Sequence, residues 1–180
     1  PGDAASPVGG VIQASDGLLY GTASAGGTHG RGALFRVAPD AGGYALIYSF
    51  RGTPADGAVP TTKLLEASDG FLYGTTSYGG ALNDGTIFRI RKDGTGYTLL
   101  RSFGGAPNDG SNPNGDLMQT TEGLIYGVTY DGGSADLGIV FRLNPDGSGY
   151  SVLRSFTGAA QTPANPWSGL TEGSDGRLYG

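Results

Sequence analysis

Few residues of this chain have side chains that could carry out chemistry. Its 180 residues include no cysteine and one histidine, His29. Thiolate nucleophiles, disulfides and Cys/His zinc sites are therefore excluded, and a lone imidazole without identified partners predicts a solvated loop side chain. A carboxylate pair for glycoside hydrolysis could come from Asp131 and Asp136, but both lie in one loop and nothing fixes their separation. We therefore expect no catalytic residue and no enzyme activity.

Two segments are dense in the oxygen ligands that calcium prefers. They contain Asn83–Asp84 and Asn108–Asp109. Neither shows the spaced Asp-x-Asp-x-Asp series with a distal Glu that an EF-type loop requires. We expect no metal and no other cofactor, and these four residues are the best candidates for a weak calcium site.

Charged and aromatic residues recur along the chain. Arginine precedes aspartate by four residues in the pairs Arg36 with Asp40, Arg89 with Asp93 and Arg142 with Asp146. These pairs predict a charge pair that braces strands or blades, rather than an anion site in three copies. Acids followed by glycine favour tight turns. They are Asp16, Asp69, Glu122 and Asp175.

Tyr-Gly pairs also recur, and they begin at Tyr20, Tyr73, Tyr126 and Tyr179. Aromatic faces can stack on sugar rings, so each pair could be a sugar platform. Recurrence favours packing between neighbouring units instead, with the glycine admitting a close neighbour.

A 53-residue repeat determines where all of these residues lie. Proline marks the start of each unit, at Pro7, Pro60, Pro113 and Pro166. The units are residues 7–59, 60–112, 113–165 and a partial 166–180, after an N-terminal remnant of residues 1–6. Three and a fraction units do not close a ring, so we expect the chain to need further repeats, its own or those of other copies, to complete the fold.

Each unit contains four short segments rich in aromatic and branched residues, which favour strands. In the second unit they are residues 63–67, 71–77, 86–90 and 97–103. Asp-Gly turns join the first two and the last two, so the strands are antiparallel. Four antiparallel strands per 53 residues predict an all-β fold of β-propeller blades, with a β-solenoid as the alternative. In the last strand, alternation places Tyr97 and Phe103 on one face and Leu100 on the other.

Alternate connections of an up-and-down sheet lie at the same end. The second-to-third loops (24–32, 77–85 and 130–138) therefore share one face with the blade-to-blade loops (51–59, 104–112 and 157–165), and both sets vary between units. Binding residues concentrate in such loops, although unconstrained drift of exposed loops would also produce the variation. The candidate binding residues on this face are His29, Arg31, Tyr78, Asn83, Asp84, Asn108, Asp109, Tyr130, Asp131 and Asp136.

Charge and hydropathy limit the possible partners. Lys and Arg number 11 against 16 Asp and Glu, which gives a net charge of −5 without a basic cluster, so we expect no nucleic acid partner. No apolar run approaches the ~20 residues of a membrane span, and no signal-peptide pattern opens the sequence.

The repeat resembles the GloVer tandem repeat of bacterial choice-of-anchor surface proteins. From the end of the first unit through the second, the pattern is carried by Ser49-Phe50, Asp56-Gly57, Pro60, Ser68-Asp69-Gly70, Leu72 to Thr76, Gly79-Gly80, Gly85, Phe88-Arg89 and Tyr97. The third unit departs from the pattern, because it lacks the Asp-Gly before its last proline. The resemblance implies a secreted, surface-anchored repeat protein with a propeller fold, and it implies no catalytic residues.

From these observations we expect a non-enzymatic extracellular or cell-surface scaffold. If it binds a ligand, we expect adhesion or the binding of a glycan or protein through the variable loop face. Two alternatives remain open. The chain could be a repeat domain of a larger secreted carbohydrate-active enzyme, or a subunit of an extracellular filament or oligomer whose exposed strand edges pair between chains.

Overall fold

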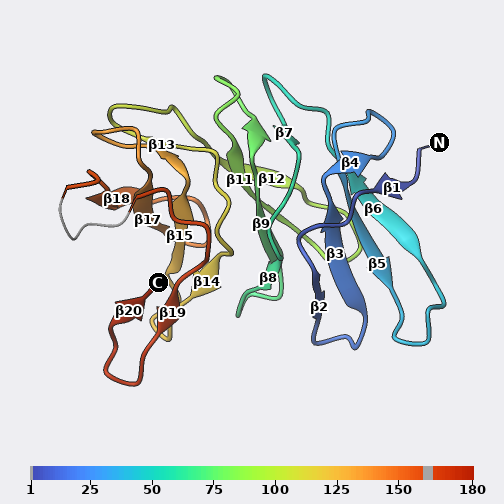
Figure 1. The fold of residues 1–180 in the computed structure, drawn as a ribbon. Helices are drawn as coiled ribbons and strands as arrows, with labels where there is room; N and C mark the ends of the chain where they lie inside the picture. Colours follow the sequence, from blue (N-terminus) through green and yellow to red (C-terminus); the bar gives the residue numbers. More distant parts are fainter. Residues whose placement is uncertain (1, 160–163) are drawn as a thin grey trace.

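The computed structural model describes residues 2–159 and 164–180, and all of their regular structure is β-strand. Three four-stranded antiparallel sheets stand side by side (Figure 1). The first is formed by β2 (Val11–Gln13), β3 (Leu19–Ala23), β5 (Ala33–Val37) and β6 (Ala45–Ser49). The second is formed by β8 (Leu65–Glu66), β9 (Leu72–Thr76), β11 (Thr86–Ile90) and β12 (Thr98–Ser102). The third is formed by β14 (Met118–Gln119), β15 (Ile125–Thr129), β17 (Ile139–Leu143) and β18 (Ser151–Ser155).

Each sheet is a propeller blade, with its strands hydrogen-bonded in chain order. A two-stranded sheet follows the third blade and consists of β19 (Thr171–Glu172) and β20 (Leu178–Tyr179). The strands of the second unit lie inside the four segments that the sequence predicts. The arrangement is the propeller, and the solenoid alternative is wrong, because each sheet is antiparallel and closes within one repeat unit.

Three two-stranded pairs lie beyond the ends of the blades. They are β1 (Ala4–Ala5) with β4 (Ala25–Gly26), β7 (Gly57–Ala58) with β10 (Tyr78–Gly79), and β13 (Gly110–Ser111) with β16 (Asp131–Gly132). β1 belongs to residues 1–6, which we expected to be an N-terminal remnant. Residues 2–6 take the place that the blade-to-blade loops take in later units, because β1 pairs with β4 as β7 pairs with β10.

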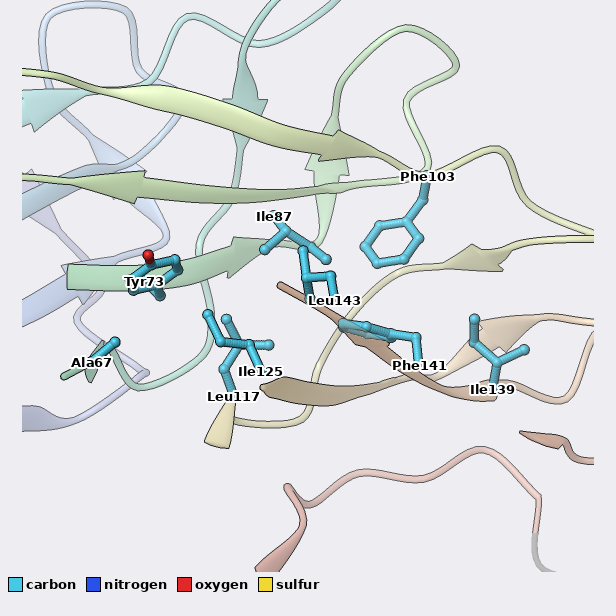
Figure 2. Packing of buried hydrophobic residues seen from close by; sticks show 9 residues of the cluster. All are labelled: Ala67, Tyr73, Ile87, Phe103, Leu117, Ile125, Ile139, Phe141 and Leu143. Carbon is cyan, nitrogen blue, oxygen red and sulfur yellow. The ribbon is translucent and has the colours of Figure 1, made fainter. Parts of the chain in front are cut away.

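The core lies between the blades in two clusters. One packs the first blade against the second through Phe50 and Phe88, whose ring centroids are 5.2 Å apart. The other packs the second against the third through Phe103 and Phe141, 5.4 Å apart, and Figure 2 shows its nine buried residues. Both blade interfaces therefore repeat one aromatic contact at the 53-residue step.

The Tyr-Gly pairs serve this packing, as the sequence predicts. Gly74 lies opposite Phe88 in the register of β9 and β11, and a Cβ on Gly74 would lie 2.6 Å from the Phe88 Cζ. Tyr73 is fully buried, and its hydroxyl donates to Asp69 at 2.7 Å. Burial, followed by the bond to Asp69, raises the pKa of Tyr73 to about 12.

The expected alternation of the last strand is wrong. The pairing of β11 with β12 shifts between Ile87 and Phe88, so Leu100 forms a β-bulge. Tyr97 consequently packs on the first blade, where its ring stacks on Tyr48 at 4.1 Å. Leu100 and Phe103 both pack toward the third blade. The extra residue lets one strand supply aromatic rings to both neighbours.

The expected Arg–Asp pairs do not form in the described part of the chain. Asp93 accepts hydrogen bonds from the amide and hydroxyl of Thr95, at 2.8 and 2.7 Å, and so closes its own turn. Arg89 donates to the Pro145 carbonyl of the next blade at 3.1 Å and lies 3.9 Å from Asp69. The arginine braces two blades, but its partners are a carbonyl and another acid.

Candidate functional site

The two sets of variable loops meet at one end of the blades. β7, from a blade-to-blade loop, pairs with β10, from a second-to-third loop, so that Ala58 lies opposite Tyr78. β13 and β16 repeat this pairing one unit later, and the small pairs line the upper side of the molecule in Figure 1. The loop face that the topology predicts is therefore confirmed. Some candidate residues hold this face together, some lie at a cavity on it, and three lie apart from both groups.

Asp109 is a structural residue of this face. It is 8% exposed, and its carboxylate accepts hydrogen bonds from the backbone amides of Gly104 and Gly110 at 3.0 and 2.9 Å. It also accepts from the Tyr150 hydroxyl of the next blade at 2.5 Å and from the Arg101 guanidinium. Burial, followed by this bond to Asp109, raises the pKa of Tyr150. Four donors occupy the carboxylate, so Asp109 clamps two blades together rather than facing a ligand.

The equivalent aspartate one unit earlier is Asp56. Its carboxylate accepts from the amides of Arg51 and Gly57 at 2.9 and 2.7 Å, and from the Tyr48 hydroxyl at 3.0 Å. One step earlier, Asp3 accepts from the Tyr44 hydroxyl at 2.5 Å. Asp56 therefore ties its loop to the preceding blade through Tyr48, whereas Asp3 holds the tyrosine of the following blade, as Asp109 does.

Three other candidates make hydrogen bonds within the loop face. The Asn83 side-chain oxygen accepts from the Gly79 amide at 3.0 Å, and Asp136 accepts from the Gly132 amide at 2.8 Å. Both residues have positive φ, which asparagine and aspartate tolerate well. Asp84 accepts from the Ser111 hydroxyl at 2.8 Å. Asn83 and Asp136 therefore hold their own turns in shape, and Asp84 connects its loop to the neighbouring blade-to-blade loop.

Two candidates lie on the first blade, away from the others. His29 is exposed and borders a cavity of about 590 Å³ along β6, together with Thr28 and Arg51. Arg31 is exposed, and its carbonyl accepts from the Val59 amide at 2.8 Å. Asn108 is exposed beside the clamp. The structure therefore does not bring His29, Arg31 and Asn108 together.

One cavity on the loop face receives equivalent residues from all four units. The residue that follows each repeat proline lines it, and these residues are Val8, Thr61, Asn114 and Trp167. Val59, Ser77, Tyr78 and Asn112 complete a lining of about 450 Å³. Because these positions precede the first strand of each sheet, the cavity lies where the blades converge. We call it the axial pocket.

The polar groups of the axial pocket are held by one another. The Asn114 side-chain oxygen accepts from the hydroxyls of Thr61 and Ser77 at 3.2 and 3.1 Å. The Asn112 amide nitrogen lies 3.4 Å from an Asp131 carboxylate oxygen at the edge of the pocket. The aromatic rings are more open to solvent, with Tyr78 47% and Trp167 70% exposed. Trp167 stands edge-on to Tyr130, with the ring centroids 4.8 Å apart.

Sequence analysis identified part of this pocket. Tyr78 lines it, and Tyr130 and Asp131 lie at its edge. Thr61, Asn114 and Trp167 were missed, although the sequence carries a signal for them. Each follows a repeat proline, and that position differs in all four units while the proline stays constant. Fixed aromatic faces beside hydrogen-bonding amides are suited to a small polar ligand with apolar faces.

Within residues 2–159 and 164–180, no three His, Asp or Glu side chains are close enough together to hold a metal ion. Over the same residues, no helix is long and apolar enough to cross a membrane.

Solved structures share this fold at low sequence identity. A nidogen/laminin complex contains a chain that matches with a TM-score of 0.63 and 19% identity, over 94% of this chain and 53% of that one. The extracellular domain assigned to a hybrid two-component system of B. thetaiotaomicron matches with a TM-score of 0.61 and 14% identity, over 93% and 19%. An ulvan lyase bound to a saccharide of glucuronic acid and sulfated rhamnose matches with a TM-score of 0.54 and 11% identity, over 86% and 41%.

This chain thus spans about half or less of each of those chains, and the likeness establishes the propeller fold alone. No curated protein sequence matches it. The family comparison covers nearly the whole chain, because the model of the Gloeobacter/Verrucomicrobia repeat matches residues 2–180. The chain therefore belongs to the Gloeobacter/Verrucomicrobia repeat family, as the resemblance of its repeat units predicts.

Proposed function

We propose that this chain is a non-catalytic extracellular repeat scaffold that binds a neutral carbohydrate in the axial pocket. The observation that carries the proposal is the convergence of four unlike residues from equivalent positions of four units on one cavity. Elsewhere, positions that packing needs keep one residue in the three complete units, such as the core phenylalanines Phe35, Phe88 and Phe141. The position after each repeat proline varies between units, so packing does not fix its residue. Because all four residues at this position face one cavity, they can contact a ligand together.

The chemistry of the lining favours sugars. Tyr78 and Trp167 offer exposed ring faces on which the apolar face of a pyranose can stack. Asn112 and Asn114 offer amide groups that pair with hydroxyls. None of the eight lining side chains is charged, so an anionic saccharide would find no cation there. We therefore expect neutral glycans to bind better than uronic or sulfated ones.

The same lining supports the absence of catalysis. General acid–base chemistry at a glycosidic bond needs a pair of carboxyl groups flanking that bond. The lining contains no carboxyl group, and Asp131 at its edge lies beside the Asn112 amide. An extracellular location is part of the proposal and rests on the resemblance to bacterial surface repeats.

A glycan array followed by calorimetric titration of the best neutral oligosaccharide tests the proposal. We expect Trp167→Ala and Tyr78→Ala each to weaken binding at least about tenfold, equivalent to about 1.4 kcal/mol. Leu82→Ala is the matched control, because Leu82 is 66% exposed on the same face but outside the pocket. An empty array, or equal affinities for all variants, would contradict the proposal.

Three further measurements address the alternatives. If incubation of the chain with the glycan that it binds releases new reducing ends, the chain cleaves glycosidic bonds and belongs to an enzyme. Light scattering measures whether the chain self-associates. If glycan binding is lost whenever self-association is lost, the chain acts as a subunit of a filament or oligomer. A protein partner that competes with the glycan for Trp167 would assign the pocket to protein binding.

A further inference from the structure

The residue before each repeat proline has a positive φ in all four units. These residues are Ser6, Val59, Asn112 and Asn165, with φ of 55°, 57°, 55° and 50°. Asparagine tolerates this left-handed region well, whereas a β-branched residue there is an outlier, because its branched Cβ crowds the backbone. Val59 is the β-branched residue of the four, so its backbone is strained.

The fold does not require valine at this position. The Val59 amide donates to the Arg31 carbonyl at 2.8 Å, and the Val59 carbonyl accepts from the Ser77 amide at 3.0 Å. Asn112 makes the same two backbone bonds one unit later, at 2.9 and 3.0 Å. Asparagine can thus form this backbone without the steric cost, and the valine must be explained by what its side chain does.

The side chain of Val59 gives the axial pocket an apolar side. Val59 and Tyr78 both line the pocket, and the strand register places Ala58 opposite Tyr78. One unit later the equivalent pair is Asn112 and Asp131, an amide nitrogen 3.4 Å from a carboxylate oxygen. The first junction therefore contributes an isopropyl group and a ring, and the second contributes polar groups. Both junctions lie between complete units.

Backbone strain that persists at a pocket is typical of a residue that serves the ligand. An isopropyl group beside a ring packs well against a methyl group, whereas a hydroxymethyl group in its place would bury a hydroxyl without a partner. On the basis of the proposed function, we propose that Val59 determines specificity in the axial pocket and selects neutral sugars that carry a methyl group. The methyl group of a 6-deoxy sugar or of an acetamido sugar packs on Val59, while the sugar hydroxyls face Asn112 and Asn114.

The probes are four sugars at the ends of otherwise identical oligosaccharides, in two pairs. L-Fucose and L-galactose differ by a methyl against a hydroxymethyl group, and N-acetylglucosamine carries the acetamide methyl group that glucose lacks. Calorimetry measures the affinity of the chain for each oligosaccharide. We expect the methyl-bearing sugar of at least one pair to bind about tenfold more tightly than its partner. The pair that shows this preference identifies the source of the methyl group.

Two substitutions separate the role of Val59 in binding from its effect on the fold. Val59→Thr keeps the β-branched shape but replaces a methyl group by a hydroxyl, so we expect the preference to disappear in a chain that still unfolds cooperatively. Val59→Asn also relieves the strain, so it should lose the preference and melt at least about 2 °C above the parent without sugar. Val11→Thr is the control and should keep the preference, because Val11 is 44% exposed and lies outside the pocket.

Three results would overturn this role of Val59. They are equal affinities within both pairs, a preference that Val59→Thr retains, and a Val59→Asn variant that melts no higher than the parent. In each case, binding of the neutral oligosaccharides themselves would leave the proposed function standing. Absence of binding to every neutral oligosaccharide would overturn the proposed function and the role of Val59 together.

Discussion

At the scale of single residues, the polar side chains of the loops divide by whether the fold already uses them. Asp109 was a candidate for binding because it stands in a loop rich in oxygen atoms, yet its carboxylate is occupied by donors from two blades. The recurrence of Asp-Gly at Asp56 and Asp109 is visible in the sequence, and it is the signal that could have marked Asp109 as structural. Sequence alone could not show that Asn83 and Asp136 hold their own turns, because a turn cap and a ligand contact use the same residue types.

Removal of the Asp109 carboxylate should destabilise the protein strongly. Asp109→Ala leaves the Arg101 guanidinium and the Tyr150 hydroxyl without their acceptor, so we expect the free energy of unfolding to fall by about 3 kcal/mol. Asn108→Ala is the neighbouring exposed control and should stay within about 0.5 kcal/mol of the parent. Urea denaturation measures both. Equal free energies of unfolding for the two variants would show that the Asp109 carboxylate does not stabilise the fold.

The glycine under each core phenylalanine admits no side chain. Gly74→Ala would place a Cβ 2.6 Å from the Phe88 Cζ, and we expect a loss of about 1–3 kcal/mol in the free energy of unfolding from overpacking. Gly104→Ala is the control, because its Cβ would meet no atom closer than 3.5 Å, and it should change stability by less than about 1 kcal/mol. Thermal unfolding of both variants measures the difference. If Gly74→Ala is as stable as the parent, the close contact between Gly74 and Phe88 is wrong.

At the scale of elements, the strands could be predicted closely and their faces only in part. Aromatic and branched residues between Asp-Gly turns define β9 and β11 well. The β-bulge at Leu100 could not be predicted from alternation, since it follows from the need of one strand to pack on both neighbours. The partner of Arg89 was also missed, because the turn beside it satisfies Asp93 locally.

Three elements of two blades meet at Glu66 on β8. Its carboxylate accepts from the Ser15 hydroxyl in the β2–β3 turn at 2.7 Å and from Lys92 in the β11–β12 turn at 2.6 Å. Burial raises the pKa of Glu66, but these hydrogen bonds outweigh it, so the pKa lies below its usual value of 4.5. A depressed pKa stabilises the fold above the unfolded value and loses that contribution as the pH falls through the folded value.

We therefore expect Glu66→Gln to cost stability at pH 7 and to cost progressively less below pH 4.5. Unfolding measured in urea from pH 7 to pH 3 gives the difference between variant and parent. A difference that stays constant over this range would show that Glu66 does not act through its charge.

At the scale of the whole molecule, the repeat makes a rigid frame and leaves the inner ends of the blades free to differ. The topology predicted the loop face, and Tyr78 was correctly placed on it. The axial pocket itself was missed, because its four equivalent residues lie 53 positions apart and the variation after each repeat proline does not by itself indicate a shared cavity. Only the three-dimensional arrangement shows that Val8 and Trp167 share one cavity.

The most direct test of the central claim is an amide chemical-shift map of the chain titrated with a neutral oligosaccharide from the array. The account predicts saturable shifts at Val8, Thr61, Asn114 and Trp167, with none in the Asp-Gly turns at the opposite end of the blades. Shifts confined to those turns, or no saturable shifts with any neutral oligosaccharide, would contradict it.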